Sequence, residues 1–138
     1  GRLLWCLGAL GGEKGMRGWI GVDLDGTLAE CRSGRGLEHI GAPVPLMCAR
    51  VRKWLADGRE VRIVTARVTA CGRSNDGGVV DDDAFSAQQR ELIRTWCIKY
   101  LGAVLEVTAA KDFAMTELWD DRVVQVERNT GRRIDGVE

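Results

Sequence analysis

The stretch Trp19–Leu28 reads WIGVDLDGTL, an apolar run that leads into two carboxylates one residue apart and then into a Gly-Thr turn. The apolar run predicts a buried strand, and Gly26 marks the point where that strand breaks into a turn. Asp23 and Asp25 are therefore expected at the carboxyl end of the strand. Open α/β sheets bind their ligands at that edge, and carboxylates combined with phosphate oxygens are a ligand set that Mg²⁺ accepts.

A calcium-binding EF-hand loop also begins with spaced Asp residues. Such a loop requires Gly at its sixth position and Glu at its twelfth. Counted from Asp23, those positions hold Leu28 and Gly34. We therefore reject the calcium-loop interpretation.

The composition indicates a single globular domain. The chain has 138 residues, of which 45% are apolar and 29% charged, enough to bury a real core. Twenty basic and twenty acidic side chains cancel, so the net charge favours neither nucleic acid nor an anionic membrane as a partner. The five cysteines are widely spaced and contain no CxxC pair. This pattern argues against a disulfide framework and a zinc site, and favours a reducing, cytoplasmic setting.

Residues 1–17 differ in character from the rest of the chain. Their apolar run, Leu3–Leu10, is too short to span a bilayer. It also lacks the basic start and the small-residue cleavage pattern of a signal peptide. We interpret residues 1–17 as an N-terminal extension or a start-site artefact, with Met16 as a candidate initiator, and residues 18–138 as the single domain.

From Gly18 onward, predicted strands alternate with predicted helices, which indicates an α/β fold with a mainly parallel sheet and helices on both faces. Pro43 and Pro45 begin a helix whose apolar residues repeat at helical spacing until Gly58. A capping box of Ser86 and Gln89 is expected to open a second helix, which ends near Gly102. Further strands are predicted at residues 60–65, 103–108, 116–119 and 123–126, a turn or short helix at 111–115, and a loop at 68–82.

Several chemically active side chains follow the predicted strands. Thr65 ends the second strand, Lys111 follows the third, and Asp120 and Asp121 close the fourth. Together with the first acidic pair, this set suits phosphoryl transfer, because a carboxylate can form an aspartyl-phosphate while Mg²⁺, a lysine and a hydroxyl hold the phosphate oxygens. Acid–base help must then come from a second carboxylate.

The order of these motifs resembles that of the haloacid dehalogenase (HAD) superfamily: DxD, a strand ending in Thr or Ser, a Lys, and a terminal acidic pair. The resemblance spans residues 19–126 and implies a three-layer Rossmann-like fold and a Mg²⁺-dependent phosphomonoester hydrolase. It implies that Asp23 is the nucleophile, and that Asp25 protonates the leaving oxygen and then activates water. Because dehalogenases of this superfamily lack the second acid, Asp25 favours a phosphatase.

The same resemblance assigns the remaining site residues. It implies that Gly26, Thr65 and Lys111 bind the phosphoryl group together with the nucleophile. Asp121 is implied to be a direct Mg²⁺ ligand, with Asp120 as a neighbouring or alternative ligand. The full set of metal ligands that it implies is Asp23, Asp25 through its main-chain carbonyl, Asp120 and Asp121.

The substrate is less well defined, because no cap domain is expected. Residues 28–42 and 68–82 are long enough for a flap and a loop only. An open site suits a macromolecular substrate, such as a nucleic-acid end or a phosphoprotein, or a small molecule enclosed by a partner subunit of a homo-oligomer. Polynucleotide 3′-phosphatases resemble the chain most in its compact ending, although Asp112 stands where they have Pro. A polynucleotide 3′-phosphatase or nucleotidase, and a catalytically idle HAD-like binding module, stay open as alternatives.

Three further residues and one rival class of protein have chemistry related to this site. Arg67, two residues beyond the strand-end threonine, is a candidate to grip a substrate phosphate with two N–H groups, or else a structural residue. His39, the only histidine, is interpreted as a loop residue without function, and Arg122 as a residue that braces a loop. A response-regulator receiver uses the same residue types, but its acidic pair closes the first strand, so we reject that class.

Overall fold

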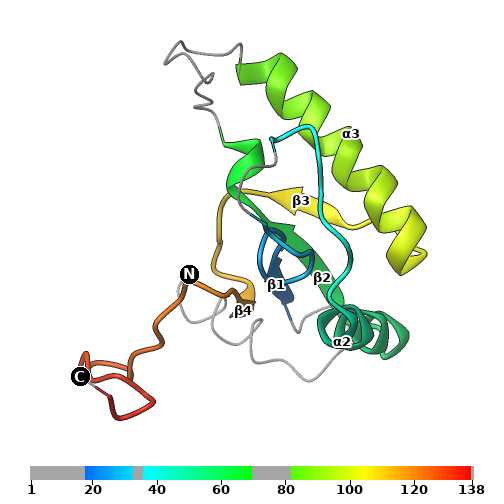
Figure 1. The fold of residues 1–138 in the computed structure, drawn as a ribbon. Coiled ribbons are helices and arrows are strands. Elements are labelled where there is room, and N and C mark those ends of the chain that lie inside the picture. The colour runs from blue at the N-terminus through cyan, green and yellow to red at the C-terminus, as the bar shows by residue number, and fades with distance from the viewer. Residues whose placement is uncertain (1–17, 33–35, 70–81, 138) are drawn as a thin grey trace.

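The computed structural model describes residues 18–32, 36–69 and 82–137. Its centre is a four-stranded parallel sheet with the strand order β3-β2-β1-β4 (Figure 1). The strands are β1 (Trp19–Asp23), β2 (Glu60–Val64), β3 (Glu106–Thr108) and β4 (Met115–Trp119). The helices are α2 (Pro45–Ala56), the 3₁₀ turn η2 (Ala66–Val68) and α3 (Asp82–Leu101). The predicted α/β class with a parallel sheet is therefore confirmed.

The strand order places the carboxyl ends of β1 and β4 side by side. The chain runs outward from β1 to β2 and β3, and then returns to the other side of β1 to form β4. Ligands of open α/β sheets bind where the strand order reverses in this way. Asp23 pairs with Val64, and Val22 pairs with Trp119, so the residue after β4, Asp120, is level with Asp23.

The core lies between the sheet and the two helices. Ile20 and Val22 of β1 and Ile63 of β2 are fully buried, as the alternation of side chains along strands requires. Pro45 occupies the first turn of α2, where its missing N–H costs nothing. Gly58, with a φ of 80°, ends that helix as the sequence predicts.

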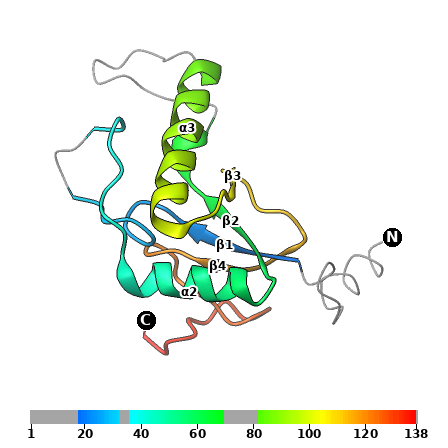
Figure 2. The ribbon, with the colours of Figure 1, turned by 90° about the vertical axis from the view of Figure 1, so that its right-hand side faces the viewer.

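Both described helices cover the same face of the sheet. Figures 1 and 2 show α2 and α3 on one side, and the two helices contact each other. This follows from right-handed crossovers between strands that are neighbours in both sequence and space. On the other face, the Arg62 guanidinium lies 4.5 Å above the ring of Trp19. No helix of the described residues covers that face, so a second helical layer stays a prediction.

Two predicted elements are wrong. The helix α3 begins at Asp82, so Ser86 lies inside the helix and does not form a capping box with Gln89, which is only 1% exposed. Residues 123–126 form no strand: Val126 makes only an isolated antiparallel bridge with Arg133, and the chain after β4 leads away from the sheet (Figure 1). A strand needs a continuous hydrogen-bonded neighbour, which this segment lacks among the described residues.

Some predictions lie outside the described residues. These are the interpretation of residues 1–17 and most of the loop predicted at 68–82, of which 70–81 are not described. Within the described ranges, no helix combines the length and the apolar character needed to cross a bilayer.

Candidate active site

A cluster of three carboxylates lies at the carboxyl edge of the sheet. Asp23 ends β1, and Asp120 and Asp121 follow β4; one oxygen atom of each lies within 4.8 Å of the other two. Octahedral ligands about 2.1 Å from a Mg²⁺ ion are about 3 to 4 Å apart. The three oxygen atoms would need at most a small closing movement to reach this spacing, so the cluster could hold a Mg²⁺ ion. It matches three of the four predicted metal residues, whereas the side chain of Asp25 lies outside it.

The hydroxyl of Thr27 lies within hydrogen-bond distance of two of the three carboxylates, those of Asp23 and Asp121. Its hydroxyl oxygen lies 3.3 Å from Oδ2 of Asp23 and 3.1 Å from Oδ1 of Asp121, and accepts a hydrogen bond of 3.0 Å from the Asp121 N–H. Since a hydroxyl has one proton, it donates to only one of the two carboxylates at a time. The sequence predicted Thr27 only as part of the turn. The one feature that could have indicated its contact with the carboxylates is its position directly after Gly26.

Gly26 makes room for Asp121. Its φ of 93° lies in the left-handed region, and a Cβ atom added to it would lie 2.6 Å from Oδ2 of Asp121. A side chain at this position would therefore be strained and would displace the carboxylate. The role of Gly26 in phosphate binding stays a prediction, but the turn needs glycine here to leave room for the Asp121 carboxylate.

The acidic surroundings change the ionisation of Asp23. Its pKa is raised from an ordinary value of 3.8 to about 7, chiefly by burial and then by the charge of Asp120 and by a hydrogen bond and charge from Asp121. The backbone N–H of Leu24 acts weakly in the opposite direction. A cation would relieve the repulsion among the three carboxylates, so the same electrostatics favour a bound metal ion.

We expect the affinity for Mg²⁺ to fall as the pH drops from 7 to 5. Below pH 7 the metal-free protein holds a proton on Asp23, and Mg²⁺ must displace it, so the loss approaches about tenfold per pH unit. The metal-free protein should also lose stability as the pH rises from about 4 to 7. Over this range Asp23 keeps its proton in the folded state but has lost it in the unfolded state, because its pKa is about 7 when folded and near 3.8 when unfolded. Titration calorimetry in buffers of different ionisation enthalpy measures the released proton.

The control is Asp120→Asn, which removes one neighbouring charge and should move this pH window downward. An affinity that stays constant between pH 5 and 7 would contradict the assignment.

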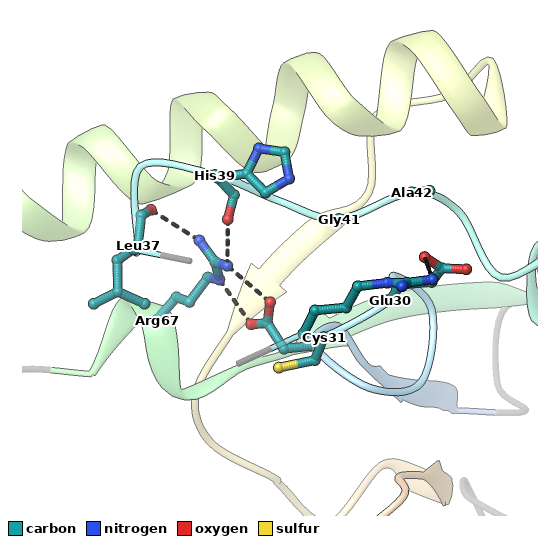
Figure 3. Close-up of a pocket in the computed structure, with 10 residues that line it drawn as sticks. Glu30, Cys31, Leu37, His39, Gly41, Ala42 and Arg67 are labelled. Atoms are coloured by element: carbon teal, nitrogen blue, oxygen red, sulfur yellow. Dashed lines mark hydrogen bonds and ion pairs between the residues drawn. The ribbon is translucent and has the colours of Figure 1, made fainter. Parts of the chain in front are cut away.

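Asp25 is held by a buried arginine (Figure 3). Nε of Arg67 donates to Oδ2 of Asp25 at 2.7 Å, and Nη2 donates to Oδ1 at 2.8 Å. The remaining N–H groups of Arg67 donate to the carbonyls of Leu37 (2.9 Å) and His39 (2.8 Å) and to Oε1 of Gln89 (3.0 Å). All five N–H groups of the guanidinium are therefore used.

The sequence left two interpretations of Arg67 open, a ligand of the substrate phosphate or a structural residue, and this arrangement supports the second. With five protein acceptors and 7% exposure, Arg67 has no donor left for a ligand in this structure. It acts as a structural residue that orients Asp25. Gln89, which completes the set, was missed as a site residue because its sequence pattern suggested a helix cap.

The two remaining predicted phosphate ligands differ in position. Thr65 is 3% exposed and follows β2; its hydroxyl accepts the backbone N–H of Arg67 at 3.2 Å, which leaves the hydroxyl proton for another acceptor. Lys111 is exposed and makes no hydrogen bond or ion pair with the described residues. Thr65 lines one cavity together with Asp23 and Asp120, and Lys111 is not among the residues that line that cavity.

The cavity lined by Asp23, Thr65 and Asp120 has a volume of about 490 Å³. A second cavity, of about 430 Å³, shares Asp25, Leu37 and Arg67 with it and extends under residues 36–42. Arg122 lines the first cavity, and its backbone N–H donates to Oδ1 of Asp120 at 2.9 Å; the bracing role expected of its side chain stays a prediction. The residues that line the first cavity include Asp23, Thr65, Phe85, Asp120 and Arg122.

The fold and the site together define an α/β protein with an acidic, cation-compatible cluster beneath a cavity at the switch point of a parallel sheet. Comparisons with protein-family models, with curated proteins and with solved structures found no match.

Proposed function

We propose that this protein is a Mg²⁺-dependent phosphomonoester hydrolase of the HAD type, with a three-layer Rossmann-like fold and no cap domain. One observation carries this proposal: one carboxylate oxygen of each of Asp23, Asp120 and Asp121 lies within 4.8 Å of the other two, at the point where the strand order of the sheet reverses. Carboxylates in this arrangement can hold a divalent cation and still leave one of them to attack phosphorus.

The metal ligands are assigned to the acidic cluster and to one main-chain oxygen. Asp23, Asp120 and Asp121 would supply carboxylate oxygens. The main-chain carbonyl of Asp25 accepts no hydrogen bond from the described residues, which leaves it available as a fourth ligand. Bound Mg²⁺ would neutralise the negative charge of the carboxylates and of the phosphate.

The reaction divides into two displacements at phosphorus. An oxygen of Asp23 attacks the phosphorus atom, the bond to the leaving oxygen breaks, and that oxygen takes a proton from Asp25. Water then attacks the phosphorus of the aspartyl-phosphate and gives a proton to Asp25. The carboxylate of Asp23 is restored and inorganic phosphate leaves. Each oxygen of Asp25 accepts one N–H group of Arg67, and a carboxylate has about four lone-pair sites, so Asp25 can carry the proton while the guanidinium keeps it in place.

We expect the side chains of Arg122 and Lys111 to act on the substrate phosphate in different ways. Arg122 lines the cavity, so Arg122→Ala should raise KM about tenfold or more through the loss of a charge-assisted hydrogen bond. Lys111, the lysine that the family resemblance assigns to the phosphoryl group, should lower kcat when it is replaced by Ala. Steady-state kinetics separate the two effects, and Arg128→Ala in the exposed C-terminal segment is the matched control. If Arg122→Ala and Lys111→Ala change KM and kcat no more than Arg128→Ala does, both assignments are wrong.

The decisive experiment is a phosphatase panel with and without Mg²⁺. It covers nucleotides, 3′-phosphorylated oligonucleotides, sugar phosphates, phosphopeptides and an aryl phosphate. Mg²⁺-dependent release of phosphate, abolished by a chelator, is the expected result. No turnover on any member, combined with measurable Mg²⁺ binding, would instead support an idle binding module. Preference for 3′-phosphorylated oligonucleotides with an affinity that falls steeply with salt would support the polynucleotide phosphatase alternative.

A further inference from the structure

The amide of Gln89 makes two hydrogen bonds in the interior. Gln89 lies on α3 and is 1% exposed. Its Oε1 accepts from Nη1 of Arg67 at 3.0 Å, and its Nε2 donates to the carbonyl of Leu37 at 2.8 Å. A buried amide is costly unless it is hydrogen-bonded, and an apolar residue would be the simpler choice on the core face of a helix. The two bonds are therefore the reason that a polar residue is tolerated at this position.

These bonds join α3 to segment 36–42. The Leu37 carbonyl accepts from both Gln89 and Arg67, and one further anchor comes from the same helix: Nε1 of Trp96 donates to the carbonyl of Gly41 at 2.9 Å. Gln89 and Trp96 are seven residues apart, which puts them on one face of α3. The helix therefore holds the main chain of the segment at two points about two turns apart.

Ile40 is the residue of this segment that packs, partly buried, against the hydrophobic core. Leu37 is 47% exposed, and Glu38 and His39 are also exposed. Its carbonyls point inward, toward Arg67, as Figure 3 shows for Leu37 and His39. Its position is therefore held by hydrogen bonds from Arg67, Gln89 and Trp96, together with the packing of Ile40 and a hydrogen bond of 2.8 Å from the Glu30 N–H to the Ala42 carbonyl.

We propose that Gln89 is a positioning residue: through Arg67, it fixes the carboxylate of Asp25 and segment 36–42 as a single unit. Arg67 donates to Asp25 with two N–H groups and to the segment with two more, and Gln89 occupies the fifth. If Gln89 is lost, one N–H group of Arg67 and the Leu37 carbonyl lose a partner. The guanidinium can then turn, and Asp25 turns with it.

Hydrogen exchange tests the structural part of the proposal without any assumption about activity. Gln89→Met keeps the length of the side chain and removes both hydrogen bonds. We expect exchange in residues 36–42 to become about tenfold faster or more, the effect of losing roughly one to two net hydrogen bonds. Exchange in α2, which these bonds do not touch, should stay unchanged. The matched control is Gln88→Met, which alters an exposed neighbour on the same helix.

A second variant covers the case in which Gln89→Met weakens the whole fold. Gln89→Asn keeps the amide but is one methylene shorter, so it cannot reach both partners. It should give the same local acceleration. Unchanged exchange in residues 36–42, or an equal acceleration in all parts of the protein in both variants, would show that Gln89 supports only the core, and would overturn the proposal.

The catalytic part rests on the proposed phosphatase function and is tested by a double-mutant cycle. Gln89→Met should lower kcat and change KM little, because Gln89 touches no substrate. In an Asp25→Asn background, the same substitution should have no further effect on kcat, since Gln89 acts through Asp25. Additive losses of kcat would overturn the link. If the protein has no phosphatase activity, the proposed function fails while hydrogen exchange still decides the structural role of Gln89.

Discussion

Replacing Asp23 with Asn abolishes the Mg²⁺-dependent release of phosphate, with an expected loss in kcat on the order of 10³-fold or more. The amide has no anionic oxygen to attack phosphorus, and it removes one charge from the set that holds the metal ion. An aryl phosphate followed by absorbance, with saturating Mg²⁺, is the assay.

The same variant keeps its fold, which separates chemistry from stability. Burial and the charges of Asp120 and Asp121 hold the pKa of Asp23 at about 7, so the ionised carboxylate destabilises the metal-free protein above that pH. Asn removes this repulsion, and the thermal midpoint at pH 8 without metal should be equal to or higher than that of the original protein. Asp57→Asn, at an exposed ion pair with Lys53, is the matched control and should keep full activity. Turnover that survives Asp23→Asn would end the phosphatase proposal.

Replacing Arg67 with Met lowers the free energy of unfolding by about 3 kcal/mol, the usual cost of breaking a buried ion pair from one side. Arg67 is 7% exposed, and its removal takes two hydrogen bonds from the carboxylate of Asp25 and one each from the His39 carbonyl and Oε1 of Gln89, while the Leu37 carbonyl keeps its bond from Nε2 of Gln89. In a chain of this length, the thermal midpoint should fall by about 10 °C.

Arg62→Met is the matched control for this loss. Arg62 also meets three carboxylates, but its partners Glu60, Glu106 and Asp112 are more than half exposed, and exposed ion pairs contribute little. Its effect should therefore be clearly smaller. Combining Arg67→Met with Asp25→Leu should recover part of the stability, because the unpaired charge is gone. A loss below about 1 kcal/mol for Arg67→Met would mean that the five bonds do not stabilise the fold.

The acidic cluster could be predicted because it depends on local sequence. The apolar run of β1, the break at Gly26 and the acidic pair after Trp119 each mark a strand end, and parallel strands bring such ends to one edge. The prediction required no knowledge of loop geometry. The spacing of Asp120 and Asp121 also left open which of them joins the cluster, and in the structure both do.

Other parts of the site depended on contacts that no local pattern contains. Gln89 and Ser86 have the spacing of a helix cap, yet the helix extends beyond them and its core face takes Gln89 inward. The residues at 123–126 have the β-branched character of a strand, but strand formation needs a neighbouring strand to supply hydrogen bonds. In both cases tertiary packing overrode a local preference.

The sequence by itself determined the parallel α/β sheet and the meeting of Asp23 with Asp120 and Asp121, because hydrophobic periodicity and strand-end residues are local properties. Only the tertiary structure decided what Asp25 and Arg67 do. Three of the five acceptors of Arg67 come from the main chain of segment 36–42 and from α3. Every residue has a backbone carbonyl, so no residue type in the sequence identifies the ones that turn inward to meet a buried charge.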